Sequence, residues 1–362
     1  MEPPRTLTLA DAPNPAPEVL AEAAQALAAG QVVVVPTETV YGLAVRADDP
    51  AALERLRTIK GRREGHAFTW HAGDPRQALE GMELPAWSAR VAAAHWPGPL
   101  TLVRRGAPRA LDEVVQDGWL GVRVPQHAGL AALLDLVDFP VVATSANPTG
   151  QPPAADAAAA AAGLAFPPAL VLDGGPAREG RGSTVARAGV GCLELLREGP
   201  LSLADLRAAG GLRIAMVCTG NTCRSPMAEA LTRGLLARAL GVADPATFGF
   251  DVQSAGVTAW DGGRASEYAQ EAVAEQGLSL AEHRSRAATL ERLEEVDRVY
   301  CMTRSHRAAL LQALPPGRGP TVELLSPAGV DVPDPFGGSL GLYRQTRDAI
   351  QAFLEARLSE WV

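Results

Sequence analysis

Residues 214–231 read Ile-Ala-Met-Val-Cys-Thr-Gly-Asn-Thr-Cys-Arg-Ser-Pro-Met-Ala-Glu-Ala-Leu: an apolar run, a small polar turn and the start of a helical pattern. Within the turn, five residues separate the thiol of Cys218 from the guanidinium of Arg224. Backbone N–H groups and the positive end of the helix dipole bind anions at the start of a helix. An arginine there can hold two oxygens of a phosphate. The stretch therefore predicts a strand, a phosphate-binding turn and a helix.

The composition of the turn predicts a reactive thiol. The positive field that binds phosphate also favours the thiolate of Cys218, the form that attacks phosphorus. Ser225 can donate a hydrogen bond to this thiolate, and Gly220 and Asn221 suit the left-handed backbone of a tight loop. Pro226 lies in the first helical turn, where its missing N–H costs no hydrogen bond. We predict that Cys218 is a nucleophile at the floor of a phosphate site.

A second motif, Val-Pro-Asp-Pro-Phe-Gly-Gly at 332–338, supplies a candidate acid. Displacement of phosphate from an alcohol, a phenol or a guanidine requires a proton donor for the leaving atom. Asp334, between two prolines, is the candidate. An Asp-Pro turn alone is common in proteins, so the prediction depends on the thiol loop being in the same domain.

These two motifs carry a resemblance. Residues 212–362 resemble the low-molecular-weight protein tyrosine phosphatase family, and more narrowly its protein arginine phosphatase branch. The resemblance implies that Cys218 is the nucleophile, Arg224 the phosphate clamp, Ser225 the thiolate stabiliser and Asp334 the general acid, without a cofactor. It also implies a phosphate loop made of the residues between nucleophile and clamp: Thr219, Gly220, Asn221, Thr222 and Cys223.

Thr222 bears on substrate choice. Tyrosine phosphatases of the family place Ile or Leu at this position, an apolar wall for a phenol ring. Threonine has nearly the same shape, but its hydroxyl can accept a hydrogen bond from a guanidinium, and a site that hydrogen-bonds its substrate discriminates well. The sequence therefore favours proteins that carry phosphoarginine, and proteins that carry phosphotyrosine remain the alternative substrates.

The first half of the chain carries clusters of hydroxyl and cationic side chains between Gly and Pro turns. Such clusters predict a cavity for polyanionic and zwitterionic ligands, and the interleaved strand and helix patterns predict a mixed-sheet α/β domain. The clusters are Pro-Thr-Glu-Thr-Val-Tyr-Gly-Leu at 36–43, Lys-Gly-Arg at 60–62, Gly-Val-Arg-Val-Pro at 121–125, Thr-Ser-Ala-Asn at 144–147 and Gly-Ser-Thr-Val at 182–185.

In this order the clusters resemble the YrdC-like family of threonylcarbamoyl-AMP synthases, over residues 10–200. That family makes threonylcarbamoyl adenylate from threonine, bicarbonate and ATP, for the modification of a tRNA adenosine. The resemblance implies that the chain contacts threonine through Thr37, His71, Arg123 and Ser183. It implies that Mg²⁺ accompanies the nucleotide, with no metal site made by the protein itself, and that ATP is bound by Lys60, Arg62, Ser145, Asn147 and Arg197.

One stretch departs from that family. After Lys-Gly-Arg the family usually continues with Pro, a few polar residues and Pro-Leu, whereas residues 63–71 read Arg-Glu-Gly-His-Ala-Phe-Thr-Trp-His. Because this stretch borders the predicted cavity, two functions stay open. The first is a fusion of a threonylcarbamoyl-AMP synthase with a phosphoarginine phosphatase. The alternative is a phosphotyrosine phosphatase whose first domain is a catalytically weak, regulatory module that binds nucleotide or RNA.

Length and pattern predict two domains, at 1–198 and 212–362, joined by a linker at 199–211. In the second domain apolar runs alternate with helical patterns, which predicts a doubly wound sheet of four parallel strands with the thiol loop at a carboxyl end. The expected strands are 213–217, 250–253, 296–302 and 321–325, and the expected helices are 224–240, 264–276, 303–313 and 339–358.

Composition limits the location and the partners. A hydrophobic content of 47% with 20% charged residues is typical of globular proteins, and a net charge of −8 argues against broad nucleic-acid binding. Four unevenly spaced cysteines favour a reducing cytoplasm over a disulfide framework. No segment reads as a signal peptide or a membrane span. Beyond its substrates, the chain is expected to meet proteins of tRNA modification and no membrane.

Overall fold

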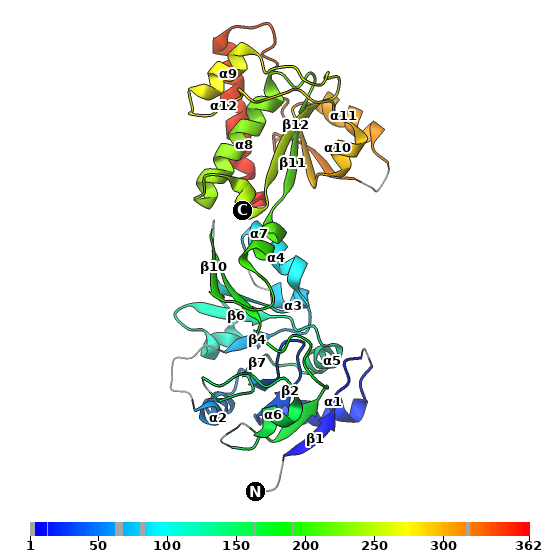
Figure 1. Ribbon diagram of the computed structural model, residues 1–362, viewed down its shortest axis with the longest axis vertical. Coiled ribbons are helices and arrows are strands. Elements are labelled where there is room, and N and C mark those ends of the chain that lie inside the picture. Colours follow the sequence, from blue (N-terminus) through cyan, green and yellow to red (C-terminus); the bar gives the residue numbers. More distant parts are fainter. Residues whose placement is uncertain are drawn as a thin grey trace. The chain divides into compact units, whose positions relative to one another are not determined.

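The computed structural model (Figure 1) describes most of the chain in two compact units. The described residues are 4–12, 14–61, 68–79, 84–148, 150–162, 164, 166–189, 192–315 and 319–362. The first unit comprises Met1–Leu84, Ser88–Gly189 and Leu193–Leu206, and the second comprises Pro85–Trp87, Val190–Cys192 and Arg207–Val362. The segment expected as a linker, 199–211, contains the helix α7 (Leu203–Gly210).

The first unit is built on a mixed sheet, as the sequence predicts. In spatial order its strands are β1 (Arg5–Thr8), β8 (Leu170–Asp173), β2 (Val33–Val35), β3 (Gly42–Arg46), β7 (Val141–Ser145), β4 (Thr69–His71), β6 (Trp119–Arg123), β5 (Leu100–Arg105), β9 (Thr184–Gly189) and β10 (Cys192–Arg197). Neighbours run antiparallel at β2–β3, β3–β7, β7–β4 and β6–β5, and parallel at β1–β8, β8–β2, β4–β6 and β5–β9.

Helices cover this sheet and hold its core. They are α1 (Pro17–Ala28), α2 (Pro50–Lys60), α3 (Pro75–Leu79), α4 (Ala86–His95), α5 (Ala128–Leu136), α6 (Ala157–Ala162) and the 3₁₀ turn η1 (Arg109–Val114). The side chain of Asp49 accepts a hydrogen bond from the N–H of Ala51, 2.8 Å away, and so caps α2. Alternate valines of β2, Val33 and Val35, belong to a fully buried cluster with Leu27 of α1. The helices thus bury one face of β2 and its neighbours.

The second unit is a doubly wound parallel sheet, which confirms the predicted fold. Its strands lie in the order β12 (Asp251–Gly256), β11 (Arg213–Cys218), β13 (Arg298–Cys301) and β14 (Thr321–Leu324). Helices α8 (Arg224–Leu240), α9 (Glu267–Ala274) and α12 (Leu340–Arg357) lie on one face, and α10 (Leu290–Glu294) and α11 (Arg304–Ala313) lie on the other (Figure 1). Two 3₁₀ turns, η2 (Pro245–Phe248) and η3 (Leu358–Glu360), complete the unit.

Candidate active sites

The loop 219–223 connects β11 to α8 at the carboxyl end of the central part of the second sheet. Cys218 ends β11 and is almost fully buried. Asn221 has a φ of 54°, in the left-handed region. The expectation of the same backbone for Gly220 was wrong, because the positive-φ residues of this loop do not include it. Asparagine alone makes the reversal, since its short polar side chain tolerates this conformation.

The sulfur of Cys218 lies among hydrogen-bond donors. The N–H of Asn221 points at Sγ over 3.3 Å, and the hydroxyl of Ser225 lies 2.9 Å from it. The Ser225 hydroxyl can donate either to the carbonyl oxygen of Ala255, 3.2 Å away, or to a thiolate at Cys218, since it has one proton and a rotatable bond. Donors directed at sulfur stabilise a thiolate more than a thiol. The geometry therefore suits a nucleophile.

Asn221 fixes the shape of the loop from inside. Its Nδ2 donates to the hydroxyls of Ser225 (2.9 Å) and Ser254 (2.8 Å), and its Oδ1 accepts from the backbone N–H of Arg286 at 2.8 Å. A ring nitrogen of His283, Nε2, lies 2.8 Å from its carbonyl oxygen. The buried side chain is thus satisfied on every side, which is what a preorganised loop requires.

Arg224 and Asp334 meet across the mouth of the loop. Arg224 Nη2 donates to Asp334 Oδ2 over 2.6 Å and to Thr219 Oγ1 over 3.3 Å. The Arg224 side chain is 6% exposed, whereas that of Asp334 is 52% exposed. The Nε of Arg224 is buried, and no residue in the described part of the chain accepts its hydrogen. Because Arg224 lines the pocket, we expect an anion bound there to accept this hydrogen.

These residues line a cavity of about 270 Å³. The cavity is bounded by the thiol, the loop, the clamp, the acid and one aromatic ring: Cys218, Thr219, Gly220, Thr222, Cys223, Arg224, Asp334 and Phe336. Phe336 is largely exposed, so its ring forms a rim rather than a floor. The second thiol of the loop, Cys223, lies 3.2 Å from the hydroxyl of Tyr343 on α12. The structure thus gathers the predicted nucleophile, clamp and acid in one pocket.

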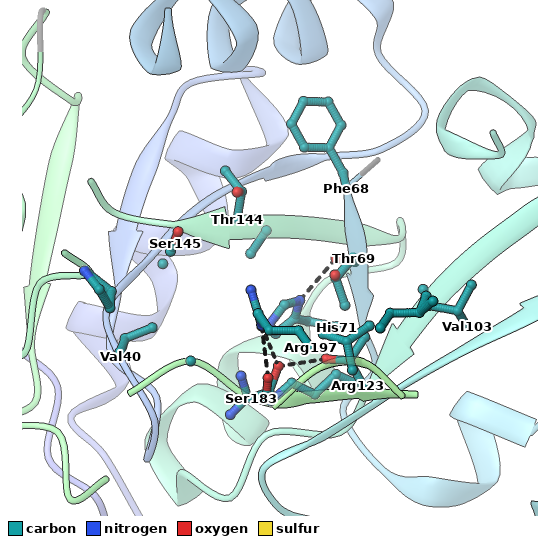
Figure 2. A pocket seen from close by; sticks show the side chains of 18 of the residues that line it. Val40, Phe68, Thr69, His71, Val103, Arg123, Thr144, Ser145, Ser183 and Arg197 are labelled. Atoms are coloured by element: carbon teal, nitrogen blue, oxygen red, sulfur yellow. Dashed lines mark hydrogen bonds between the residues drawn. The ribbon is translucent and has the colours of Figure 1, made fainter. Parts of the chain in front are cut away.

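In the first unit, a larger cavity of about 630 Å³ lies against the sheet (Figure 2). Seven of the nine residues predicted to bind threonine or ATP line it: Thr37, His71, Arg123, Ser145, Asn147, Ser183 and Arg197. Arg62 lies outside the described residues, and so do residues 63–67 of the unusual stretch 63–71. Lys60 is almost fully buried and is not among the lining residues.

The residues predicted to bind threonine include a buried cation. Arg123 Nη2 lies 2.8 Å from Glu38 Oε1. The side chain of Arg123 is 6% exposed and that of Glu38 is 2% exposed. Glu38 also accepts a hydrogen bond from the N–H of Gln126 at 3.0 Å. His71 lies beside Arg123 in the cavity wall (Figure 2), with its Nδ1 3.0 Å from the carbonyl oxygen of Thr69. Burial, and then the charge of Arg123, lower the pKa of His71 to about 3. The ring is therefore neutral at pH 7.

The residues predicted to bind ATP are held by the loop after β7. Lys60 donates to the carbonyl oxygens of Ser145 (2.5 Å) and Asn147, and to Asn147 Oδ1 at 3.2 Å. Arg197 instead donates to the carbonyl oxygen of Ser183, from Nη2 at 2.9 Å and from Nε at 3.1 Å (Figure 2). The Ser183 hydroxyl in turn is 2.8 Å from that of Thr101. The hydrogen bonds from Arg197 to Ser183 therefore connect the residues predicted to bind ATP with those predicted to bind threonine.

Comparison with known proteins assigns each unit. Residues 25–199 match the Sua5/YciO/YrdC family model, described as telomere recombination, and residues 213–361 match the model of low molecular weight phosphotyrosine protein phosphatases. A protein-arginine-phosphatase of Bacillus subtilis is 39% identical over 144 residues, which are 39% of this chain and 91% of that protein. The chain belongs to both families.

Two further relatives accompany these matches. A putative threonylcarbamoyl-AMP synthase of Mycobacterium tuberculosis is 35% identical over 192 residues, which are 51% of this chain and 85% of that protein. A crystal structure of a YwlE mutant from Bacillus subtilis is 38% identical, with a TM-score of 0.36, and covers 41% of this chain and 97% of that one. The two family models and the relatives from Bacillus subtilis and Mycobacterium tuberculosis confirm the resemblance predicted for each half.

Sequence reasoning missed several side chains of both sites. In the Sua5/YrdC unit it missed Glu38, although this residue lies inside the quoted motif, because nothing local indicated a cation partner 85 residues away. In the phosphatase unit it missed His306, whose Nε2 lies 2.8 Å from Thr219 Oγ1. The only local signal is a Thr303-Arg-Ser-His306 helix start, which is a capping pattern and not a catalytic motif. No group of three potential metal ligands occurs in the described residues.

Proposed function

We propose that the second unit removes phosphate from arginine side chains of proteins through a phosphocysteine at Cys218. The observation that carries this proposal is the thiol of Cys218 on the floor of a 270 Å³ pocket that Arg224 and Asp334 also line. The loop N–H groups and the free Nε of Arg224 provide donors for the phosphate oxygens. The related Bacillus subtilis protein is named a protein-arginine-phosphatase.

The residues support a two-step reaction. The Cys218 thiolate attacks phosphorus, the S–P bond forms, the P–N bond breaks, and the proton of Asp334 passes to the leaving guanidine nitrogen. Asp334, now a carboxylate, then takes a proton from water, which attacks phosphorus and releases the thiolate. The half-exposed position of Asp334 suits this exchange of protons. In each step Arg224 holds the phosphate oxygens in place.

Thr222 lines the pocket, and a hydroxyl at this position would favour a guanidinium substrate over a phenol. The test compares hydrolysis of phosphoarginine and phosphotyrosine peptides by the wild-type chain and by Thr222→Ile. We expect the wild type to prefer phosphoarginine, and the variant to shift the ratio of kcat/KM toward phosphotyrosine by about tenfold, the size of one hydrogen bond. Thr247→Val, on η2, is the matched control and should leave the ratio unchanged. A ratio that does not move in Thr222→Ile would refute this account of specificity.

We further propose that the first unit synthesises threonylcarbamoyl-AMP. The threonine amine and bicarbonate form a carbamate, whose oxygen attacks the α-phosphorus of ATP while pyrophosphate leaves, so that no nucleophilic side chain is needed. Arg123 would bind the threonine carboxylate, the neutral His71 would accept a hydrogen bond, and Thr37 and Ser183 would orient the substrate. Lys60, Ser145, Asn147 and Arg197 would hold the nucleotide, and Arg62 would join them.

Magnesium would enter with the nucleotide and shield its phosphate charge. The donors fit this role, because the carboxylates of Asp117 and Glu198 line the cavity and oxygen is the ligand that Mg²⁺ prefers. Phosphate oxygens and water would complete the coordination. The residues of this chain would then have to orient the substrates and exclude water around the carbamate.

Release of pyrophosphate separates the two functions left open by the sequence. We expect pyrophosphate from ATP only when threonine and bicarbonate are both present. Release that does not depend on threonine, or nucleotide binding without release, would favour a first unit that only binds nucleotide or RNA.

Because tRNA modification proteins would consume the adenylate, we place the chain in the cytoplasm. We place the boundary between the two enzymes within residues 199–211. In the described residues no helix is long and apolar enough to cross a bilayer.

A further inference from the structure

A buried histidine on α11 lies behind the proposed phosphatase site. His306 is 5% exposed, and both of its ring nitrogens contact threonine hydroxyls. Nε2 is 2.8 Å from Thr219 Oγ1, and Nδ1 is 2.9 Å from Thr303 Oγ1. The proposed reaction uses neither contact. A buried imidazole that makes two short hydrogen bonds has a fixed orientation. It therefore also fixes the orientation of the two hydroxyl groups that it contacts.

The direction of these hydrogen bonds follows from Arg224, which can only donate. Arg224 Nη2 donates to Thr219 Oγ1, so the Thr219 proton is available for Nε2 of His306. The imidazole proton then lies on Nδ1 and is donated to Thr303 Oγ1. The hydroxyl of Thr303 has Ser305 Oγ as its own acceptor, 2.8 Å away. Every donor in this chain of hydrogen bonds has an acceptor when the ring of His306 is neutral.

The charges around the imidazole agree with a neutral ring. Burial, and then the charge of Arg224, lower the pKa of His306, while the carboxylates of Asp334 and Asp331 act in the opposite direction. Arg224 lies on α8, and both carboxylates lie in the loop before α12. The hydrogen-bond geometry and the surrounding charges thus favour the same proton on the same nitrogen.

We propose that His306 is a positioning residue of the phosphatase site: it orients the Thr219 hydroxyl, which in turn holds the guanidinium of Arg224 where a phosphate binds. The inference rests on the proposed function of the second unit. Arg224 Nη2 has two contacts, the half-exposed Asp334 and the loop residue Thr219. An incoming phosphate competes with Asp334 for the guanidinium. The phosphate displaces the carboxylate of Asp334 because both are anions, but it does not displace the neutral hydroxyl of Thr219. The hydrogen bond to Thr219 therefore keeps Arg224 in position while Asp334 is released.

Five variants of the full-length chain test the inference: His306→Leu, Thr219→Val, the double variant, His306→Gln and His306→Asn. Two measurements are made on each, kcat/KM on a phosphoarginine peptide and the affinity for inorganic phosphate by calorimetry. We expect His306→Leu and Thr219→Val each to lower kcat/KM by about five- to tenfold and to weaken phosphate binding by a similar factor, the effect of one hydrogen bond. The double variant should be no worse than either single variant, because both break the same chain.

His306→Gln is the rescue, because its amide oxygen can take the place of Nε2 and accept from Thr219. It should recover most of the loss, whereas His306→Asn, which reaches only the position of Nδ1, should not. Equal activity of the Gln and Asn variants, multiplicative losses in the double variant or unchanged phosphate affinity in Thr219→Val would overturn the inference. Thr219→Val changes one oxygen to a methyl group, so it reports even if His306→Leu fails to fold.

The two measurements also separate this inference from the function on which it rests. A wild-type chain that binds phosphate but does not hydrolyse the phosphoarginine peptide would refute the proposed phosphatase, and the phosphate affinities of the variants would still decide the role of His306. A wild-type chain that hydrolyses phosphoarginine, with variants equal to it in both measurements, would refute the role of His306 alone.

Discussion

The two candidate sites each contain an arginine paired with a carboxylate, but the two pairs differ in exposure. In the second unit, Arg224 is buried while its partner Asp334 is 52% exposed. In the first unit, Arg123 and Glu38 are both buried, with 6% and 2% of their side chains exposed. A carboxylate in contact with water can exchange its partner at little cost. A fully buried pair cannot, because separating it leaves a charge without compensation.

This difference assigns the two pairs different roles. In the proposed reaction Asp334 leaves Arg224 when a phosphate arrives, takes up a proton from solvent and passes it to the leaving nitrogen, so that pair would take part in the chemistry. Glu38 holds Arg123 in place inside the sheet, so that pair belongs to the architecture of the cavity. The comparison predicts that changes at Asp334 alter activity alone. It predicts that changes at Arg123 or Glu38 alter stability as well.

The largest effect is expected from Asp334→Asn. The amide cannot protonate the leaving nitrogen, so kcat on a phosphoarginine peptide should fall by about 10²–10⁴-fold, the usual contribution of a general acid. The free energy of unfolding should stay within about 0.5 kcal/mol of wild type, because the carboxylate is half-exposed. Asp331→Asn, in the same loop and paired with the exposed Arg304, is the matched control and should retain activity. A strongly destabilised Asp334→Asn would contradict the proposed division of roles.

The second prediction concerns Arg123→Met. The change leaves Glu38 buried without its cation, so the first unit should lose about 3–5 kcal/mol of stability. Hydrogen exchange of the amides of β6 and β7, measured on the full-length chain, reports this loss. Adding Glu38→Gln should restore part of the stability without restoring threonine-dependent release of pyrophosphate. Normal protection in Arg123→Met would show that the pair is not structural.

The third prediction uses the pKa of His71, about 3 in the folded chain against an ordinary value of 6.5. As the pH falls below 6.5, the unfolded chain binds a proton that the folded chain does not, so stability is lost between about pH 6.5 and pH 3. From pH 7 to pH 5, wild type should lose about 2 kcal/mol more than His71→Gln. Urea titrations of the full-length chain at the two pH values measure this difference. Equal losses in the two proteins would mean that His71 titrates normally.

The smallest effect is expected at the cap of α2. Asp49→Ala removes the hydrogen bond to the N–H of Ala51, which should cost about 1 kcal/mol. Because α2 ends at Lys60 and Lys60 is held independently by Ser145 and Asn147, release of pyrophosphate should stay close to wild type. A large loss of activity in Asp49→Ala, measured under the same conditions, would mean that the cap itself positions Lys60.

Much of the second unit could be predicted from sequence because its chemistry is local. The nucleophile, the clamp and the loop lie within residues 218–225, and the four expected strands correspond to β11–β14 within a few residues. The short helix α10 was not predicted, because five residues do not display a helical period. His306 and Tyr343 reach the loop from distant segments, which only tertiary packing brings together.

The first unit was harder to predict because its cavity draws on many strands. The ordered motifs indicated which residues line the cavity, since four of the five motifs begin or end a strand of one sheet; the fifth, at 60–62, lies at the end of α2. They did not indicate which residues contact each other. Arg197 was expected with the nucleotide, yet it donates to Ser183 of the threonine set. Lys60 donates to two backbone carbonyl oxygens, contacts that carry no sequence signal.

The central claim is that Cys218 forms a covalent bond to phosphorus, and mass spectrometry of the quenched enzyme tests it most directly. Wild-type enzyme is mixed with a phosphoarginine peptide, quenched in acid and digested. The enzyme fragment that contains Cys218 should then carry one extra phosphoryl group. Cys218→Ser should lack this phosphocysteine and the turnover, yet still bind inorganic phosphate. Hydrolysis without any phosphorylated Cys218, or a Cys218→Ser variant with normal turnover, would contradict the account.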